Sequence, residues 1–249
     1  MTQLVGILNV TPDSFSDGGQ FFDAGAALAQ AEKLFSEGAA IVDVGAESTR
    51  PNAEALNPDE EWSRLEPVLK VLLHRYGGKI SLDTYHPETV RRAFEIGPVI
   101  VNDVTGMTNP AMIDIVVEFQ AHCIVSQLPA TEVQEAHSQE QLDDIEAVKQ
   151  DLLSKEAELV QRGLPAENII LDPGIGFGKT MRLNEELLTF PALVPDKQVM
   201  IGYSRKRFLG EDRMELEPNV AAGRKAIAAG AAYLRIHDVA GHRMLLTEN

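Results

Sequence analysis

Residues Asn168–Lys179 read Asn-Ile-Ile-Leu-Asp-Pro-Gly-Ile-Gly-Phe-Gly-Lys, a short apolar run that stops at an aspartate and continues into a glycine-rich loop. A continuous apolar run of this length is typical of a strand that is buried on both faces. Asp172 stands where the run ends. The stretch therefore predicts a strand of a parallel sheet that presents a polar side chain at its carboxyl end.

The same pattern recurs along the whole chain. Including this one, eight strand-like runs cover Leu4–Val10, Ile41–Gly45, Lys79–Asp83, Val99–Asp103, Ala121–Val125, Asn168–Asp172, Gln198–Gly202 and Tyr233–His237. Longer amphipathic stretches between them predict helices, among them Ala24–Glu37, Asp59–Tyr76, Pro87–Glu95, Gln139–Arg162 and Val220–Ala229. Helices and strands alternate from one end to the other.

About eight strand-plus-helix units in 249 residues match the size of a single-domain (β/α)8 TIM barrel over residues 1–249. A doubly wound sheet uses the same alternation and is the alternative. The barrel is favoured because no break in composition separates two domains and because unusual residues follow nearly every strand. In these barrels the functional residues lie at the carboxyl ends of the strands.

The composition excludes several classes of protein. With 38 acidic and 22 basic residues the formal net charge is −16, which disfavours nucleic acid and anionic membrane surfaces as partners. The single cysteine, Cys123, excludes an internal disulfide and a cysteine-based zinc site. We find no secretory signal and no apolar run of about 20 residues that could cross a bilayer, so we expect a cytoplasmic protein.

The loop after Asp172 superficially resembles a nucleotide-binding motif. A phosphate-binding P-loop needs four residues between its glycines, whereas only three separate Gly174 from Gly178. The glycines also lack the dinucleotide-binding spacing. Both nucleotide interpretations are rejected.

Two kinds of polar residue follow the predicted strands. Asp83, Asn102 and Asp172 suit a flat heterocycle with several N–H donors and ring acceptors, although helix N-termini could also satisfy buried carboxylates. The second kind is cationic and, in so acidic a chain, predicts a local anion site; its members are Arg50, Lys206, Arg235 and His237. Asn9 could give a neutral oxygen to a magnesium ion that bridges phosphates.

These segments together resemble the dihydropteroate synthase family, in order and over essentially the whole chain. The segments that carry the resemblance are Asn9–Gly19, Glu47–Pro51, Asp83-Thr84, Asn102–Gly106, Asp172–Lys179, Ser204–Lys206 and Arg235–Asp238. The resemblance implies a TIM barrel, usually a homodimer. The implied reaction joins 6-hydroxymethyl-7,8-dihydropterin diphosphate to p-aminobenzoate, with Mg²⁺, and yields dihydropteroate and pyrophosphate.

The resemblance also implies roles for individual residues. Those expected to bind the pterin are Asp83, Asn102, Val104, Asp172, Phe177, Lys206 and Arg235. Those expected around p-aminobenzoate are Phe15, Thr49, Pro51 and Lys206. The diphosphate is expected to meet Asn9, Arg50, Arg235 and His237, and Asn9 also Mg²⁺. The catalytic set is expected to be Asn9, Arg50, Lys206, Arg235 and His237.

The chain departs from the family pattern after the fifth strand. The family has a His-Met-Gln-Gly type segment there, whereas this chain has Ser126-Gln127-Leu128-Pro129. The methionine of that segment lines the pterin pocket, and we expect Gln127 in its place, so that an apolar wall becomes polar. Altered sulfonamide discrimination is one hypothesis that follows.

Two other functions remain possible on the same fold. One is a pterin-binding methyltransferase-type barrel, which has no need for the Asn9–Gly19 segment or for the anion-binding residues Arg50, Lys206 and His237. The other is a non-catalytic paralogue. The loss of a residue from the catalytic loops would favour this interpretation. Because these features are all present, synthase activity is the favoured prediction.

Overall fold

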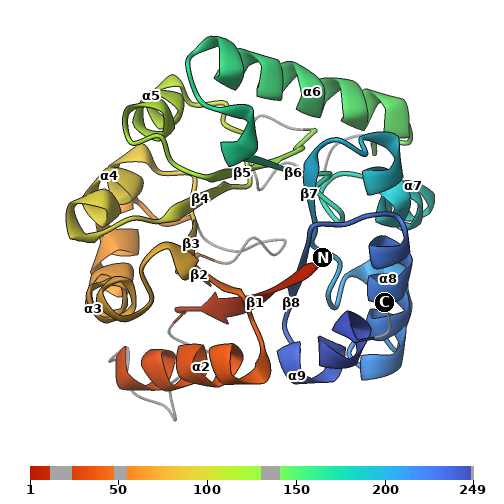
Figure 1. Ribbon diagram of the computed structural model, residues 1–249, viewed down its shortest axis with the longest axis horizontal. Coiled ribbons are helices and arrows are strands. Elements are labelled where there is room, and N and C mark those ends of the chain that lie inside the picture. The colour runs from red at the N-terminus through yellow and green to blue at the C-terminus, as the bar shows by residue number, and fades with distance from the viewer. Residues whose placement is uncertain (12–23, 48–54, 130–140, 248–249) are drawn as a thin grey trace.

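The computed structural model is a closed barrel of eight parallel strands surrounded by helices (Figure 1). It describes residues 1–11, 24–47, 55–129 and 141–247. Each strand pairs with its neighbour in sequence, and β1 pairs with β8 to close the sheet. This closure confirms the predicted TIM barrel and rules out the doubly wound sheet, whose edges stay open.

The strands follow the predicted runs to within two residues. They are β1 (Gln3–Asn9), β2 (Ile41–Gly45), β3 (Ile80–Asp83), β4 (Ile100–Asp103), β5 (Cys123–Ser126), β6 (Ile169–Asp172), β7 (Gln198–Ile201) and β8 (Tyr233–Ile236). The helices are α2 (Ala24–Glu37), α3 (Pro58–Tyr76), α4 (Pro87–Ile96), α5 (Pro110–Glu118), α6 (Ile145–Gln161), α7 (Met181–Glu186), α8 (Leu216–Ala228) and α9 (Val239–His242). Helix α6 is shorter than predicted because Asp144 caps its first turn.

The helices begin where the sequence satisfies their free N–H groups. Asn57 accepts hydrogen bonds from the N–H groups of Asp59 and Glu60, and Glu60 accepts in return from the N–H of Asn57. Pro58 then occupies the first turn of α3, where a missing N–H costs nothing. Such caps fix the length of the loops that separate strands from helices.

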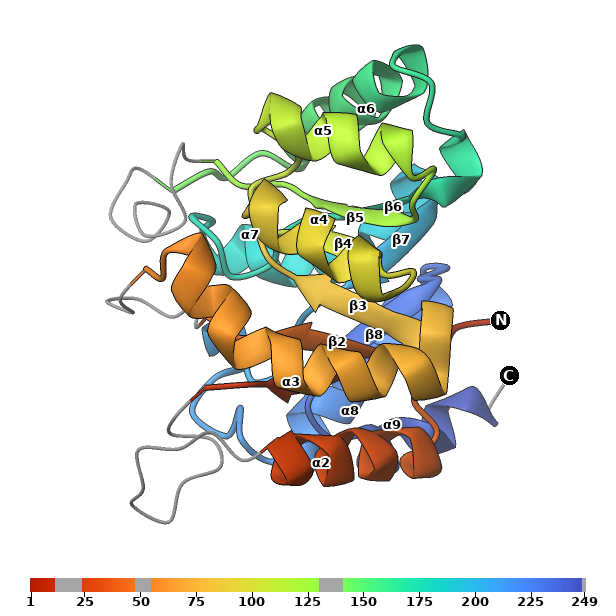
Figure 2. The ribbon, with the colours of Figure 1, turned by 90° about the vertical axis from the view of Figure 1, so that its left-hand side faces the viewer.

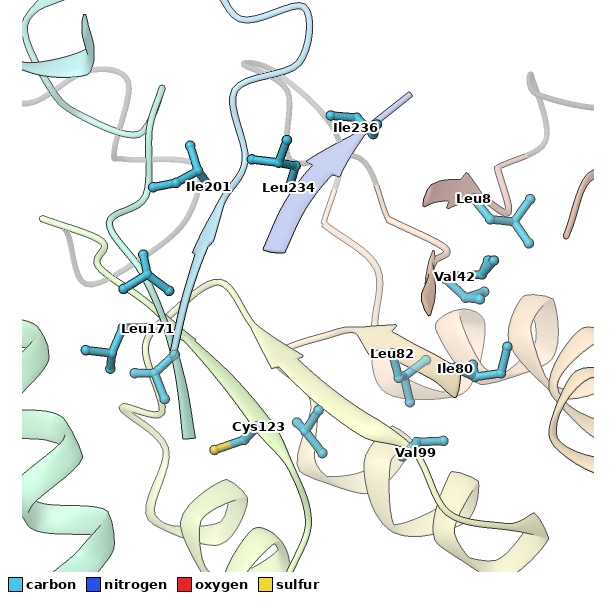
Figure 3. Packing of buried hydrophobic residues seen from close by; sticks show 14 of the residues in the cluster. Leu8, Val42, Ile80, Leu82, Val99, Cys123, Leu171, Ile201, Leu234 and Ile236 are labelled. Carbon is cyan, nitrogen blue, oxygen red and sulfur yellow. The ribbon is translucent and has the colours of Figure 1, made fainter. Parts of the chain in front are cut away.

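The outward faces of the strands form the main core against the helices. Figure 3 shows side chains such as Leu82, Leu171 and Leu234 extending from the strands into this layer, all of them buried. Cys123 belongs to the same layer, and burial raises the pKa of its thiol to about 12. The thiol is therefore a core group rather than a nucleophile.

The inward faces form a second, smaller apolar cluster inside the barrel. Its members are Val5, Ile41, Ile100, Ile124, Ile170 and Met200, with Tyr233 packed against them. This cluster fills the barrel interior, as the side-chain layers of TIM barrels do. Any pocket must therefore lie beyond it, toward the carboxyl ends of the strands.

The barrel has two distinct ends. In Figure 2 the strand arrows point to one end, and the N-terminus lies at the opposite end. Among the described residues, the structure contains no helix that is both long and apolar enough to span a bilayer.

Candidate active site

A small pocket opens at the carboxyl end of the barrel. Its walls are Asp83, Asn102, Val104, Ser126, Asp172, Gly174, Ile175, Phe177, Gly202, Lys206 and Arg235. All seven residues that we expect to bind a pterin belong to it.

Arg235 is the centre of the charged part of the pocket. Its Nε donates to Asp43 Oδ2 at 2.6 Å and its Nη2 donates to Asp83 Oδ2 at 2.6 Å. Asn102 Nδ2 donates to Asp43 as well, at 3.1 Å to Oδ2. The guanidinium is thus fixed by two carboxylates that come from β2 and β3.

Asp43 is a member of this charged network that the sequence did not point to. Its side chain is completely buried (0% exposed) and pairs with Arg235 and Asn102. A signal existed, because a charged residue inside a fully buried strand such as Ile41–Gly45 needs a partner. The nearest segment that resembles the family begins at Glu47, beyond this strand.

Burial and ion pairing shift the pKa values of the ionisable groups in this network in opposite directions. Burial raises the pKa of Asp83 to about 7, although the charge of Arg235 opposes the rise and that of Asp43 adds to it. For Arg235 burial lowers the pKa, but Asp43 and Asp83 outweigh it and leave the guanidinium more basic than usual. Arg235 therefore stays charged, and Asp83 is less acidic than an ordinary aspartate.

Asp172 presents a carboxylate on the β6 side of the pocket. Its Oδ1 accepts from the N–H of Gly174 at 2.8 Å. Burial raises the pKa of Asp172, and that hydrogen bond and the charges of Arg235, Lys206 and Lys179 oppose the rise. Asp172 and Asn102 are both buried, which suits hydrogen bonding to a ligand that displaces water.

Lys206 lies against the aromatic ring of Phe177. The ammonium Nζ lies 4.4 Å from the ring centroid, within the range of a cation–π contact. Burial and the neighbouring Arg235 lower the pKa of Lys206 to about 8, while Asp172 and Asp83 oppose this. The aliphatic part of Lys206 also lies against the loop after β6, since a Cβ on Gly176 would stand 2.8 Å from Lys206 Cδ.

Of the predicted diphosphate residues, Arg235 lines the pocket, whereas Asn9 and His237 are not part of its lining. His237 follows β8, and its Nδ1 lies 3.0 Å from Ser204 Oγ, which also accepts from the backbone N–H of His237. Asn9 ends β1 and is exposed. Phe15, Thr49, Arg50 and Pro51 lie outside the described residues, so the p-aminobenzoate set and one cation of the anion site stay predictions.

Gln127 does not line the pocket, contrary to our expectation. Its Nε2 donates to Asp151 Oδ2 of α6 at 3.0 Å, and the residue faces a second hollow of about 650 Å³ between β5 and α6. Ser126 lines the pocket instead. Successive side chains of a strand point to opposite faces. Ser126 therefore shares the inward face of Ile124, and Gln127 lies on the outward face.

The geometry favours the binding of a planar heterocycle with donors on one edge. Carboxylates of Asp83 and Asp172 accept hydrogen bonds, Asn102 offers an amide, and Lys206 with Phe177 forms a cationic and aromatic wall. Among the described residues no three His, Cys, Asp or Glu side chains are grouped as a metal cage. The interior apolar cluster closes the pocket from below.

The comparisons with known proteins agree with this geometry. The family described as pterin binding enzyme matches residues 5–237. Dihydropteroate synthase of Neisseria meningitidis serogroup C is 37% identical over 251 residues, which cover 95% of this chain and 88% of that enzyme.

Two solved structures of Xanthomonas albilineans dihydropteroate synthase are similar to the chain. The one with 4-aminobenzoic acid has a TM-score of 0.89 and 35% identity over 99% of this chain and 91% of that one. The one in complex with 7,8-dihydropteroate has a TM-score of 0.84 and 32% identity over 99% and 92%. This chain therefore belongs to the pterin binding enzyme family.

Proposed function

We infer that this chain is a dihydropteroate synthase of folate biosynthesis, which condenses 6-hydroxymethyl-7,8-dihydropterin diphosphate with p-aminobenzoate. Relatives that bind 4-aminobenzoic acid and 7,8-dihydropteroate support this assignment. The observation that carries it is one pocket in which Asp83, Asn102 and Asp172 face Lys206 and Arg235.

The reaction breaks one C–O bond and forms one C–N bond. Pyrophosphate leaves the methylene carbon with the bonding electron pair, the amine nitrogen attacks that carbon, and the nitrogen loses one proton. Positive charge develops on the methylene and is shared with the electron-rich pterin ring. The neighbouring carboxylates favour this charge, and cations at the rim favour the departing anion.

In this chain, one group of residues would bind the pterin and another group would bind the diphosphate. Asp83, Asn102 and Asp172 would hold the donor edge of the pterin deep in the pocket, and Lys206 would cover one side of the ring. His237 and Arg50 would meet the diphosphate at the rim. No strong general base is needed, because an aromatic amine is already nucleophilic.

Magnesium fits the donor chemistry at the end of β1. Mg²⁺ takes one or two protein oxygens together with phosphate oxygens and water, rather than a full protein cage. Asn9 is exposed there and offers one amide oxygen. The ion would neutralise charge on the leaving diphosphate. We expect turnover to stop in excess chelator and to return with Mg²⁺.

The resemblance further supports a homodimer that acts in the cytoplasm, as part of the same proposal. Light scattering of the purified chain tests the dimer, and a monomer that turns over at full rate would contradict it.

Pyrophosphate release tests the function directly. We expect release from the pterin diphosphate to depend on p-aminobenzoate and to match dihydropteroate formed. No release would contradict synthase activity and favour a methyltransferase-type barrel or a non-catalytic paralogue. Release that forms no dihydropteroate when p-aminobenzoate is present would show hydrolysis in place of transfer.

A further inference from the structure

Lys179 is a buried lysine that lies behind the pocket and is not part of its wall. Only 3% of the residue is exposed. Its ammonium donates to three main-chain carbonyls, those of Gly174 at 2.9 Å, Gln127 at 3.0 Å and Phe177 at 3.1 Å. A buried cation bound by neutral acceptors is costly, so this one needs an explanation.

The ammonium connects two loops that meet at the pocket. Gln127 directly follows β5, whereas Gly174 and Phe177 belong to the loop after β6. The loop closes tightly on this point, since a Cβ on Gly174 would lie 2.1 Å from the carbonyl oxygen of Gln127 and 3.0 Å from Lys179 Nζ. Gly174 also has a φ of 66°, which glycine adopts without strain.

The loop that Lys179 holds carries one wall of the pocket. Phe177 lies against the ammonium of Lys206, and Gly176 lies against its methylene groups. A shift of residues 174–177 would therefore move both Phe177 and Lys206.

Lys179 also acts electrostatically on the pocket. Its positive charge is one of the influences that lower the pKa of Asp172 against the effect of burial. The other groups that face Asp172 are Arg235 of β8, Lys206 after β7 and the N–H of Gly174. Lys179 itself faces Asp172, Lys206 and Asp151 of α6, and burial lowers its own pKa to about 7.

We propose that Lys179 is a positioning residue for pterin binding: its ammonium fixes residues 174–177 so that Phe177 and Lys206 form one wall, and it places a positive charge beside Asp172. The proposal rests on the proposed function, because it takes the pocket to be a pterin site. Lys179 acts through its neighbours and touches no substrate.

Two substitutions separate hydrogen bonding from charge. Lys179→Met removes both, whereas Lys179→Gln keeps N–H donors and removes the charge. Asn184→Ala is the matched control, because Asn184 Oδ1 accepts from the N–H of Gly176 at 2.6 Å and so holds the same loop without any charge.

The measurement is calorimetric titration with 6-hydroxymethylpterin, which lacks the leaving group and does not react, from about pH 5.5 to about pH 9. At neutral pH we expect Lys179→Met to weaken binding about tenfold or more. The pH at which binding falls to half on the acid side should rise in both lysine variants, since Asp172 protonates more readily without the charge. Protonation of Asp83 contributes to the same fall in every variant, so only the shift relative to the wild type reports on Lys179. Asn184→Ala should weaken binding without moving that pH.

Three outcomes would overturn the proposal. They are unchanged binding by folded Lys179→Met, an acid-side midpoint that is the same in Lys179→Gln as in the wild type, and an equal shift in Asn184→Ala. Should Lys179→Met fail to fold, Lys179→Gln decides. Failure of the wild type to bind the pterin or release pyrophosphate would instead contradict the proposed function.

Discussion

Two neighbouring layers inside the barrel have opposite chemistry, although the same strands build them. The lower layer is apolar, and on five of the eight strands the inward residue two positions further along is polar or charged. The pairs, lower member first, are Ile41 and Asp43, Ile100 and Asn102, Ile124 and Ser126, Ile170 and Asp172, and Tyr233 and Arg235. One step of the two-residue strand period separates an apolar layer that stabilises the fold from the polar layer of the candidate site.

The two layers differ in what holds them together. The hydrophobic effect stabilises the apolar layer, and this effect does not depend on the orientation of the side chains. The layer therefore tolerates small changes in side-chain shape. The upper layer contains buried charges that need each other, as Arg235 needs Asp43 and Asp83. Removing one partner there leaves an uncompensated charge. We therefore expect unequal effects of substitution in the two layers.

The largest effect should follow the loss of Arg235. Arg235→Met removes the partner of two buried carboxylates and should cost about 2–4 kcal/mol in kcat/KM. It should also lower the free energy of unfolding by about 3 kcal/mol. Steady-state kinetics and denaturant titration measure the two losses. Arg235→Lys is the control, since it keeps the charge without the planar fork; wild-type kinetics in both variants would place the site elsewhere.

Asp83→Asn should lower kcat/KM by a similar or smaller amount and change the response to pH. In the folded protein Asp83 has a pKa of about 7, above its ordinary value of 3.8, so the folded state loses stability as this group ionises between these values. The asparagine variant lacks this loss. Its melting temperature relative to the wild type should therefore rise between about pH 4 and about pH 7. A difference that is constant with pH would show that Asp83 is ionised throughout this range.

A change in the lower layer should affect stability alone. Ile124→Val removes one buried methyl group and should lower the free energy of unfolding by about 1 kcal/mol. Because Ile124 lies below the pocket, kcat/KM should stay within about twofold of the wild type. A large kinetic loss would mean that the two layers are mechanically coupled.

The smallest effect should come from Ser126 on the same strand. Its hydroxyl lines the pocket and makes no hydrogen bond within the described part of the chain, so it is available to a ligand. Ser126→Ala should weaken pterin binding by about 1 kcal/mol or less. Gln127→Ala is the control, because that side chain faces α6. A larger loss from Gln127→Ala would reverse our assignment of the two faces.

Much of the fold and of the pocket could be predicted from the sequence. The apolar runs fix the strands because each is buried on both faces, and the polar residues that follow them meet because all strands point to one end. Asp83, Asn102, Val104, Asp172, Phe177, Lys206 and Arg235 were predicted and share one pocket.

The errors come from residues whose role depends on the face of a strand or on long-range pairing. Gln127 was placed in the pocket although its parity differs from that of Ile124, which the sequence alone could have shown. Asp43 lies within a strand, and its partner Arg235 is 192 residues away, so no local pattern connects them. The role of Lys179 depends on a carbonyl 52 residues away.

The pairing of Arg235 with two carboxylates has a consequence for the salt dependence of binding. In the wall of the pocket and directly behind it, three acids, Asp43, Asp83 and Asp172, are balanced by three bases, Lys179, Lys206 and Arg235. An uncharged bicyclic ring can bind beside these balanced charges almost independently of ionic strength. The diphosphate carries several negative charges that they do not compensate, so only its attraction to the rim should weaken as salt is added.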